Sequence, residues 1–522
     1  MKNLTRLFAL MLALLMVFAI AGCGSSTTYE SYYEEDGAQN DETNDTNDTN
    51  DTNSDTTSDG ANNNNNSGGG NSQGGSNNTT SKPTTNVKPG IQAGQVGDKI
   101  DASKWGIATS DKGIEDKVNL KGKTIRMLCF KTTNYTSAAF QRTIKAFEKE
   151  YGCKVKIDYA AFGTEYQTTL RNAIAAKEPY DVAYMHASWS LDTIASNLYE
   201  PLNGSMTTAD LLDKNNKGID LSKSIEISWD GNIYGVCGYR GVNPMIAFYN
   251  KVMFERDFDE ADDPRTLYEN GKWTWDKFIE LGSKVTDKAN DKWFASWNFR
   301  KAEMVASFGG NPVTIKNGVP TVTIESKEYN AGLKNLAKMC YGTTQVVMPQ
   351  NTEDQLEAFL AGKFYMYTEE SDRYIKIMDK IATCNAFKKS GANLGIVPLP
   401  LGDTNKDKAY PTGWIETTVC PKGANPDVLI AWAKFWTTYT DPVTTDKTKM
   451  NKKDQAMIDK LLAKINPRRC SYSDSSYAFN SLEWNMVTDV ARGKDISATT
   501  AEYKPQMQSC IDATMSALKK LK

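Results

Sequence analysis

The chain has 522 residues, a formal net charge of −3 at pH 7 and 39% hydrophobic residues. That length is more than one hydrophobic core usually serves, so we expect at least two lobes or domains. The near-neutral balance argues against nucleic acid or an acidic membrane surface as a partner, and the single histidine, His186, excludes a metal site built from several imidazoles.

The amino terminus has the pattern of a secretory signal peptide, which we assign to residues 1–22. Lys2 and Arg6 precede an apolar run, Leu7–Ile20, that is too short for a retained membrane span. The run leads into Ala21-Gly22-Cys23, which resembles the end of a bacterial lipobox, where the cysteine is acylated and begins the mature protein. We therefore predict lipidation at Cys23, with palmitate among the acyl chains, and a protein anchored to the extracellular face of the cell membrane. The alternative is a secreted protein whose cysteine lies near the cleavage site by chance.

Residues 23–96 are expected to form a disordered tether that follows the lipidated cysteine. Asn, Asp, Thr, Ser and Gly dominate this segment, so it has little apolar surface to offset the entropy of ordering its backbone. Residues 24–96 hold eleven acidic residues and two lysines, a net of −9, which leaves about +4 for the chain from 97 onward. A flexible chain of this length reaches on the order of 50 Å, which favours a Gram-positive envelope.

The remaining sequence lacks the common signatures of catalysis and metal binding. Neither a phosphate-binding G-x-x-x-x-G-K-[ST] loop nor a G-x-S-x-G nucleophile elbow occurs, so we expect no catalytic residue, metal or cofactor. The other cysteines are spread singly, which fits neither a zinc site nor a dense disulfide scaffold. Some could pair, but most are interpreted as small buried apolar residues: Cys129, Cys153, Cys237, Cys340, Cys384, Cys420, Cys470 and Cys510.

Strand and helix patterns alternate in the first part of the folded body. Residues 123–130 form an apolar run typical of a strand buried on both faces, and residues 140–151 show helical spacing before a glycine. A strand at 153–159, a helix over 166–174 and a strand at 181–185 follow. This alternation predicts a parallel sheet covered by helices, with ligand beyond the carboxyl ends of the strands. Those ends are Lys131–Thr136, Ala160–Thr164 and His186–Trp189.

Further along, the hairpin signal Ser228–Gly235 precedes a strand pattern at Met245–Tyr249. A series of segments along the chain, beginning at Phe147, resembles the family 1 extracellular solute-binding proteins. Each match is weak alone, but their order across roughly residues 120–450 is specific to that family. The matching segments are Phe147–Gly152, Tyr180–Tyr184, Gly231–Val236, Phe248–Lys251, Trp273–Phe278, Phe359–Tyr367 and Gly395–Pro400.

The resemblance implies an α/β, two-lobe, periplasmic-binding-protein-like fold of type II, with a ligand cleft between the lobes. By analogy, lobe 1 comprises 97–240 plus 398–445, and lobe 2 comprises 241–397 plus 446–522. The chain would cross between lobes near 239–243, 397–401 and 440–452. The implied function is that of a monomeric receptor, which captures a solute by hinge closure and delivers it to ABC transporter permease subunits. Most members of the family bind mono- or oligosaccharides.

Aromatic residues at the expected cleft could stack on the apolar face of a sugar ring. Trp189 follows the third strand, Tyr239 lies at the first crossover, Trp414 follows Thr412-Gly413, and Trp484 lies near the carboxyl terminus. Ordinary core packing is the competing interpretation for each tryptophan. Trp273 and Trp275 stand at a helix start, where packing is favoured.

Polar residues at the loops that the family places around the cleft could bind solute hydroxyls. Arg240 is the strongest candidate, because a guanidinium at a crossover can clamp hydroxyls or a carboxylate. The acidic residues at 369–372 have an alternative role at a helix amino terminus, and His186 could be a satisfied interior histidine. The polar ligand-binding set is Asn134, Ser188, Arg240, Asn243, Glu370 and Arg373.

Three other functions compete with a sugar receptor. Within the same fold, the solute could be acidic or a peptide, because Arg240 would suit a carboxylate. A surface glycan-binding lipoprotein without transport duty would also suit the long tether. A polysaccharide-active enzyme is disfavoured, because Glu369 and Asp372 would lie side by side rather than across a scissile bond.

Overall fold

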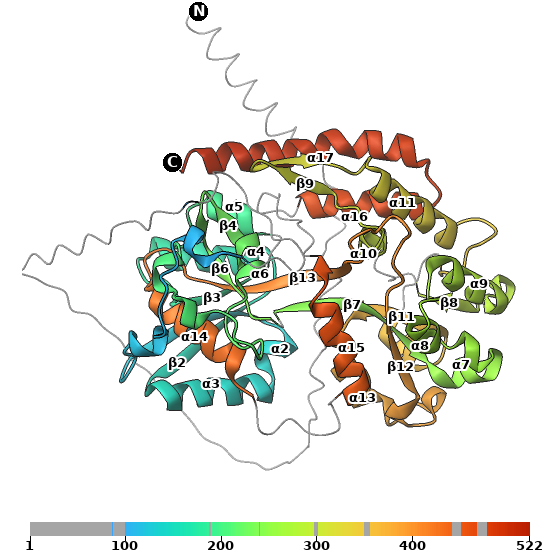
Figure 1. Cartoon of the computed structure of the whole chain (residues 1–522), viewed down its shortest axis with the longest axis horizontal. Coiled ribbons are helices and arrows are strands. Elements are labelled where there is room, and N and C mark those ends of the chain that lie inside the picture. The colour runs from blue at the N-terminus through green and yellow to red at the C-terminus, as the bar shows by residue number, and fades with distance from the viewer. Residues whose placement is uncertain are drawn as a thin grey trace, which may run out of the picture. The chain divides into compact units, whose positions relative to one another are not determined.

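The computed structural model describes residues 86, 100–186, 189–239, 241–296, 301–348, 355–440, 450–466 and 478–521. All described residues lie in the compact unit Ser81–Lys522. The predicted signal segment, Cys23 and most of the tether lie outside the described residues. The two-lobe α/β architecture predicted from the sequence is confirmed (Figure 1).

The first lobe contains the predicted parallel sheet. Strands β1 (Thr124–Phe130), β2 (Lys154–Ala160) and β3 (Val182–His186) run parallel in the order β2-β1-β3. Helix α3 (Ala138–Tyr151) begins two residues before the predicted start, because the side chain of Ser137 accepts a hydrogen bond from the Phe140 amide. It ends as predicted at Gly152, whose φ of 63° is in the left-handed region.

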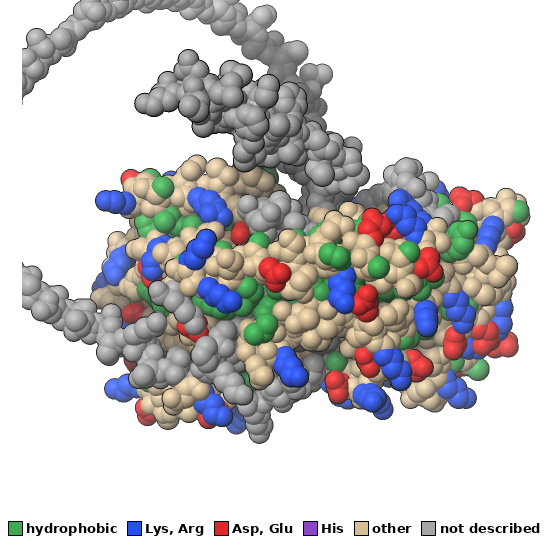
Figure 2. Space-filling model, turned by 90° about the horizontal axis from the view of Figure 1, so that it is seen from above, with side chains coloured by type: hydrophobic (Ala, Val, Ile, Leu, Met, Phe, Trp, Pro, Cys, Tyr) green, Lys and Arg blue, Asp and Glu red, His purple; other side chains and the backbone are tan. Residues whose placement is uncertain are grey.

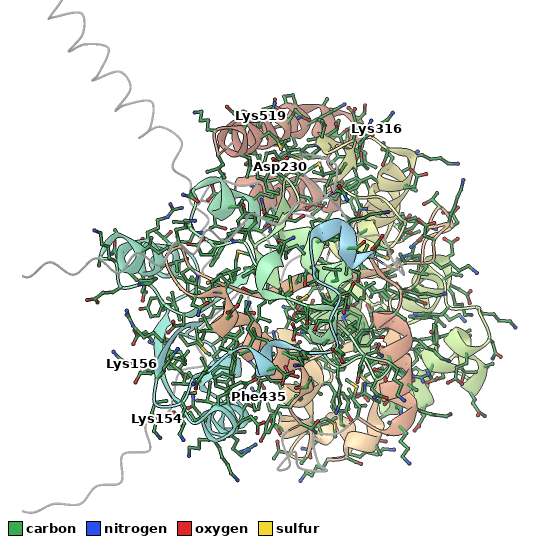
Figure 3. All side chains as sticks on the ribbon, turned by 60° about the vertical axis from the view of Figure 1, so that its left-hand side comes forward. Lys154, Lys156, Asp230, Lys316, Phe435 and Lys519 are labelled. Atoms are coloured by element: carbon green, nitrogen blue, oxygen red, sulfur yellow. The ribbon has the colours of Figure 1, made fainter. Side chains whose placement is uncertain are left out.

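The outer strand of this sheet carries charge on its exposed positions. Lys154 and Lys156 on β2 are solvent-exposed, and both lie at the outer margin of the first lobe (Figure 3). Lysines on an edge strand discourage pairing with another chain. The remaining elements of the first lobe are α2 (Thr133–Thr136), α4 (Thr164–Ala175), α5 (Ser190–Ala195), α6 (Leu221–Ser224), β4 (Ser228–Trp229), β5 (Asn232–Ile233), β6 (Gly235–Val236) and α14 (Pro426–Thr438).

Two long strands join the lobes into one continuous sheet of order β2-β1-β3-β13-β7-β11-β8. The last residues of β13 (Tyr410–Val419) pair antiparallel with β3, whereas its earlier residues Thr412 and Ile415 pair with the start of β7 (Val242–Asn250). The register shifts between these two residues. In Figure 1, β7 and β13 accordingly cross the middle of the unit, between the elements of the two lobes.

The second lobe extends the sheet on the other side of β7. Strand β11 (Phe364–Glu370) pairs antiparallel with one edge of β7, β12 (Leu394–Pro398) pairs with the other edge, and β8 (Trp293–Ala295) runs parallel to β11. The remaining elements, whose assignment to the second lobe is a proposal, are α7 (Lys251–Asp257), α8 (Pro264–Glu269), α9 (Trp275–Val285), α10 (Lys301–Ala306), β9 (Val313–Lys316), β10 (Val319–Val322), α11 (Lys327–Cys340), α12 (Gln355–Leu360), α13 (Arg373–Ile381), α15 (Lys452–Leu462), β14 (Ile465–Asn466), α16 (Ala478–Ala491) and α17 (Ile496–Lys519).

The two faces of β7 contribute to different hydrophobic clusters, since side chains alternate along a strand. Met245, Ala247 and Tyr249 belong to a cluster that also holds α10 and α16 residues, whereas Ile246 and Phe248 belong to one that holds α13 and α15 residues. We call β7 and β13, which join the lobes, the hinge strands. The two faces of the sheet at these strands are named the α10–α16 side and the α13–α15 side after the helices that cover them. On the surface seen in Figure 2, basic and acidic side chains are interspersed, as expected for a near-neutral body.

The contacts after β12 bear on where the chain returns to the first lobe. We expected a return near 397–401, but the indole of Trp273 donates to the Pro398 carbonyl, and the Gly402 amide and Asn405 side chain both donate to the Ser307 carbonyl. Trp273 and Ser307 are second-lobe residues. These contacts favour a return within β13, so we propose a boundary near Thr412. Helix α17 contacts both α16 and the first-lobe helix α5, and its assignment to lobe 2 stays a proposal.

Candidate functional site

An aromatic cluster occupies the carboxyl edge of the first-lobe sheet. Trp189, which precedes α5, is only 1% exposed, and its ring centroid lies 4.8 Å from that of Phe162 and 5.7 Å from that of Phe130. The hydroxyl of Tyr166 in the same cluster donates to the Leu128 carbonyl at 3.0 Å. Trp189 is therefore a packed ring of the first-lobe core in this structure. Its predicted role as a stacking platform stays a prediction.

His186 lies beside this cluster at the end of β3. Its ring centroid is 5.3 Å from that of Phe162 and 6.1 Å from that of Trp189. Burial among these apolar rings lowers the pKa of His186 to about 3, because the charged imidazolium is poorly solvated there. The side chain is thus neutral at physiological pH.

The lowered pKa of His186 predicts a loss of stability in mild acid. The pKa of a histidine in the unfolded chain is about 6.5, whereas that of His186 in the folded chain is about 3. Between these two pH values the unfolded chain binds a proton that the folded chain does not, so the free energy of unfolding falls as the pH drops from 6.5 toward 3. We expect a loss of up to about 2 kcal/mol at pH 5. Urea unfolding of wild type and His186→Gln at pH 7.5 and pH 5.0 measures it. An identical pH dependence in both proteins would contradict the assignment.

Tyr239 lies at the first crossover and contacts groups on both sides of it. The buried Lys223 ammonium donates to the Tyr239 carbonyl at 2.7 Å, pairs with Asp220 at 2.7 Å and lies 4.6 Å from the centroid of the Tyr239 ring. The Tyr239 hydroxyl donates to the Asp459 carbonyl of α15 at 3.3 Å. Tyr239 thus connects a first-lobe lysine to a second-lobe helix at the hinge.

Buried charged residues gather on the α10–α16 side of the hinge strands. Glu370 is 6% exposed and pairs with Met245 across β11 and β7, which places both side chains on the same face. Lys301 is 1% exposed, and its ammonium lies 4.3 Å from the centroid of the Trp484 ring. Glu483 accepts a hydrogen bond from the Tyr329 hydroxyl at 2.8 Å. Helix α10 also contacts β13, the strand that carries Trp414.

A pocket of about 590 Å³ lies on the other side of the hinge strands. The start of β7, the first turn of α13 and the length of α15 line it. Asn243 is among its lining residues, but Glu370 and Trp484 are not. Arg373 begins α13 and is half-buried.

Ser188 and Arg240 lie outside the described residues, as do the side chains of Asn134 and Trp414. Their assignment as ligand-binding residues stays a prediction.

Sequence reasoning missed Lys301, Glu303 and the lining residues of α15. Lys301 and Glu303 stand in the otherwise apolar segment of α10, and both are at most 6% exposed. Two charges in so short an apolar helix are a signal that could have found them, because buried charges need specific partners. For α15 no comparable signal exists, because its pattern is that of an ordinary amphipathic helix.

The described part of the chain contains no group of three or more His, Cys, Asp or Glu side chains that could hold a metal ion. None of its helices is both long and apolar enough to cross a membrane. Five of the seven described cysteines are buried, and the other two, Cys384 and Cys510, are partly buried.

The fold is similar to that of solved sugar-binding proteins at low sequence identity. An ABC substrate-binding protein from Listeria monocytogenes in complex with cycloalternan matches with a TM-score of 0.53, 16% identity and coverage of 76% of this chain and 100% of the other. The sugar-binding protein MalE from Xanthomonas citri matches with a TM-score of 0.58 and 13% identity, over 76% of this chain and 99% of the other. The galacto-N-biose-/lacto-N-biose I-binding protein from Bifidobacterium longum matches with a TM-score of 0.55 and 13% identity, over 75% of this chain and 97% of the other.

Matches at this level of identity establish the fold. No curated protein matches the sequence significantly. A family model described as bacterial extracellular solute-binding protein matches residues 142–448, more than half of the chain. The chain therefore belongs to the family of bacterial extracellular solute-binding proteins.

Proposed function

We propose that this solute-binding protein captures a mono- or oligosaccharide by hinge closure and delivers it to the permease subunits of an ABC importer. The observation that carries the proposal is the continuous sheet in which β7 and β13 join two lobes, in a fold that matches solved ABC substrate-binding proteins complexed with sugars. Members of the family bind their solutes without catalysing a reaction.

The connections at the hinge support closure as the mechanism. The β13–β7 pairing is short and irregular, since the register shifts between Thr412 and Ile415. When the lobes rotate about this junction, few hydrogen bonds between β13 and β7 need to change, and the core of each lobe stays intact. The Tyr239 hydroxyl bond to α15 is a contact that this rotation would lengthen or shorten.

The location of the protein follows from the amino-terminal sequence. We propose that residues 1–22 are a signal peptide and that Cys23 is lipidated, with palmitate among its acyl chains. The segment 23–96 would then hold the folded body outside the cell membrane as a monomer. This tether length and composition favour a Gram-positive envelope.

Two alternatives remain within the family. The solute could be acidic or another non-sugar, which Arg240 would favour if it faces the ligand. The protein could also hold a surface glycan without transporting it. The first is distinguished by the choice of solute and the second by the presence of a partner permease.

The first test is a thermal-shift screen of the chain from Gly24 onward. We expect a neutral mono- or oligosaccharide to raise the melting temperature, because a ligand that binds only the native state stabilises it by about 2.7 kcal/mol at 100 times its Kd. The panel also contains uronic acids, amino acids and short peptides. Chromatography of the recovered ligand checks that it is chemically unchanged.

Each other outcome of the screen has a definite meaning. Stabilisation by uronic acids alone would reject the neutral-sugar proposal and favour an acidic solute. Cleavage of the sugar would contradict a receptor without catalysis. Stabilisation by peptides alone would leave the family assignment unchanged and would identify a peptide, instead of a sugar, as the solute.

A further inference from the structure

Three buried polar side chains in the first lobe lack a hydrogen-bond partner. They are the hydroxyl of Tyr135, both amide atoms of Gln167 and the hydroxyl of Ser190. Tyr135 and Gln167 are 4% exposed and Ser190 is 0% exposed. A buried polar group without a partner costs free energy, and native proteins retain few of them unless water or a ligand completes the bond.

The three side chains share one edge of the sheet. Tyr135 belongs to α2 after β1, Gln167 is in the first turn of α4 after β2, and Ser190 begins α5 after β3. Because the three strands are parallel, the helices that follow them start at the same edge. This is the edge at which sheets of this kind bind ligands.

The ring of Phe130, at the end of β1, connects these three positions. Its centroid lies 6.1 Å from that of Tyr135 and 4.4 Å from that of Tyr166, the residue before Gln167. It also lies 5.7 Å from the centroid of Trp189, the residue before Ser190. The unpartnered groups are therefore arranged around a single aromatic cluster, of which Phe162 is only partly buried.

A similar arrangement occurs at the carboxyl edge of the second-lobe sheet. Ser296 follows β8 directly, and Thr368 lies in the carboxyl half of β11; each is 1% exposed with an unpartnered hydroxyl. Unsatisfied hydroxyls thus also occur at the carboxyl ends of two second-lobe strands.

The chemistry of the first-lobe groups limits what they could bind. Two hydroxyls and one amide can each donate and accept a hydrogen bond, and none carries a charge. Of the charged residues at this edge, Lys131 and Glu165 are solvent-exposed, and Asp192, in the first turn of α5, is partly buried. A molecule whose hydroxyls also donate and accept, and whose ring has an apolar face, fits these groups and the neighbouring aromatic rings.

We propose that Tyr135, Gln167 and Ser190 form the first-lobe part of the ligand site, and that they bind an uncharged, hydroxyl-rich portion of the solute. This inference rests on the proposed receptor function and names residues that would make the solute contacts. It also favours a neutral sugar over an acidic solute. Opening of the lobes would admit the solute, and closure would complete the missing hydrogen bonds.

The test is the variant Gln167→Leu in the chain from Gly24 onward. Calorimetric titration and thermal shift use maltotriose, lacto-N-biose and β-1,6-galactobiose as neutral probes and digalacturonate as the acidic probe. We expect a 10- to 100-fold loss of affinity for the neutral probe that binds wild type. The unliganded variant should melt at the same temperature as wild type or higher, because an unpartnered buried amide has been removed.

Two further variants make the result interpretable. Thr286→Val is the matched control, because its hydroxyl is also buried without a partner but precedes β8, at the opposite end of the strand. It should leave affinity unchanged. Tyr135→Phe removes one hydroxyl with little change of shape and should lower affinity about tenfold, which covers the case in which Gln167→Leu fails to fold.

The outcomes separate the inference from the function on which it rests. Wild-type affinity for a neutral probe in both Gln167→Leu and Tyr135→Phe would overturn the inference and leave the receptor function intact. A clear fall in the melting temperature of unliganded Gln167→Leu would also overturn the inference. It would show that the Gln167 amide already has a partner in the unliganded protein, such as a structural water molecule. Binding of digalacturonate alone would overturn the neutral class. Failure of wild type to bind any solute in the wider screen would overturn the receptor function itself.

Discussion

Replacing Trp189 with alanine is expected to lower the free energy of unfolding by about 3–5 kcal/mol, the usual cost of truncating a buried tryptophan. The ring is 1% exposed and packs against both Phe130 and Phe162, so truncation leaves a cavity that these rings can fill only in part. Urea unfolding of the unliganded protein, followed by circular dichroism, measures the change.

Two companion variants define the role of the Trp189 ring. Trp189→Phe keeps an aromatic ring in the cluster and should recover more than half of the lost stability. Trp436→Ala removes a ring that is 39% exposed on α14 and should cost much less. If Trp189→Ala left stability within 1 kcal/mol of wild type while abolishing solute binding, the ring would be a ligand platform and not a core residue.

Replacing Asp210 with alanine is expected to cost about 3 kcal/mol, because one member of a buried ion pair is removed. Asp210 is 0% exposed and pairs with the Lys434 ammonium at 3.0 Å. It also accepts hydrogen bonds from the backbone amides of Ile114 at 2.7 Å and Thr207 at 2.9 Å. The variant leaves both amides and much of the lysine charge without their acceptor. Thermal and urea unfolding both report the loss.

The control for Asp210 is the second carboxylate on the same lysine. Glu115 contacts Lys434 at 2.7 Å but its side chain is 52% exposed, so Glu115→Gln should change stability by less than about 1 kcal/mol. Asp210→Asn should lose an intermediate amount of stability, because Ile114 and Thr207 donate to different oxygens of Asp210 and the single amide oxygen of asparagine can accept from one of them. Equal losses for Glu115→Gln and Asp210→Ala would show that burial does not set the strength of these pairs.

Local sequence patterns predicted the first-lobe sheet well. The apolar run at 123–130 became β1, and the helical spacing that ends at Gly152 became α3. These signals are local: a strand buried on both faces needs a continuous apolar run, and a helix needs apolar residues at 3.6-residue spacing and a stop. The order of such segments was also sufficient to identify the family.

The sequence was less informative about the candidate site. Trp189 was singled out as a stacking residue, and the structure places it in a packed cluster. Gln167 was not singled out, although it lies in the first turn after an expected strand end, because a glutamine in a helix is ordinarily a surface residue. Its burial depends on what packs over α4, which no local pattern records.

The sequence by itself determined the alternation of elements, the parallel first-lobe sheet and the family. Only the tertiary structure decided that β13 pairs with both β3 and β7, that Lys301 lies over Trp484, and which buried polar groups lack partners. The physical reason is the range of the interactions. Periodicity and capping act over a few residues, whereas strand pairing, burial and hydrogen-bond completion join residues more than a hundred positions apart, and their outcome depends on the packing of the whole unit.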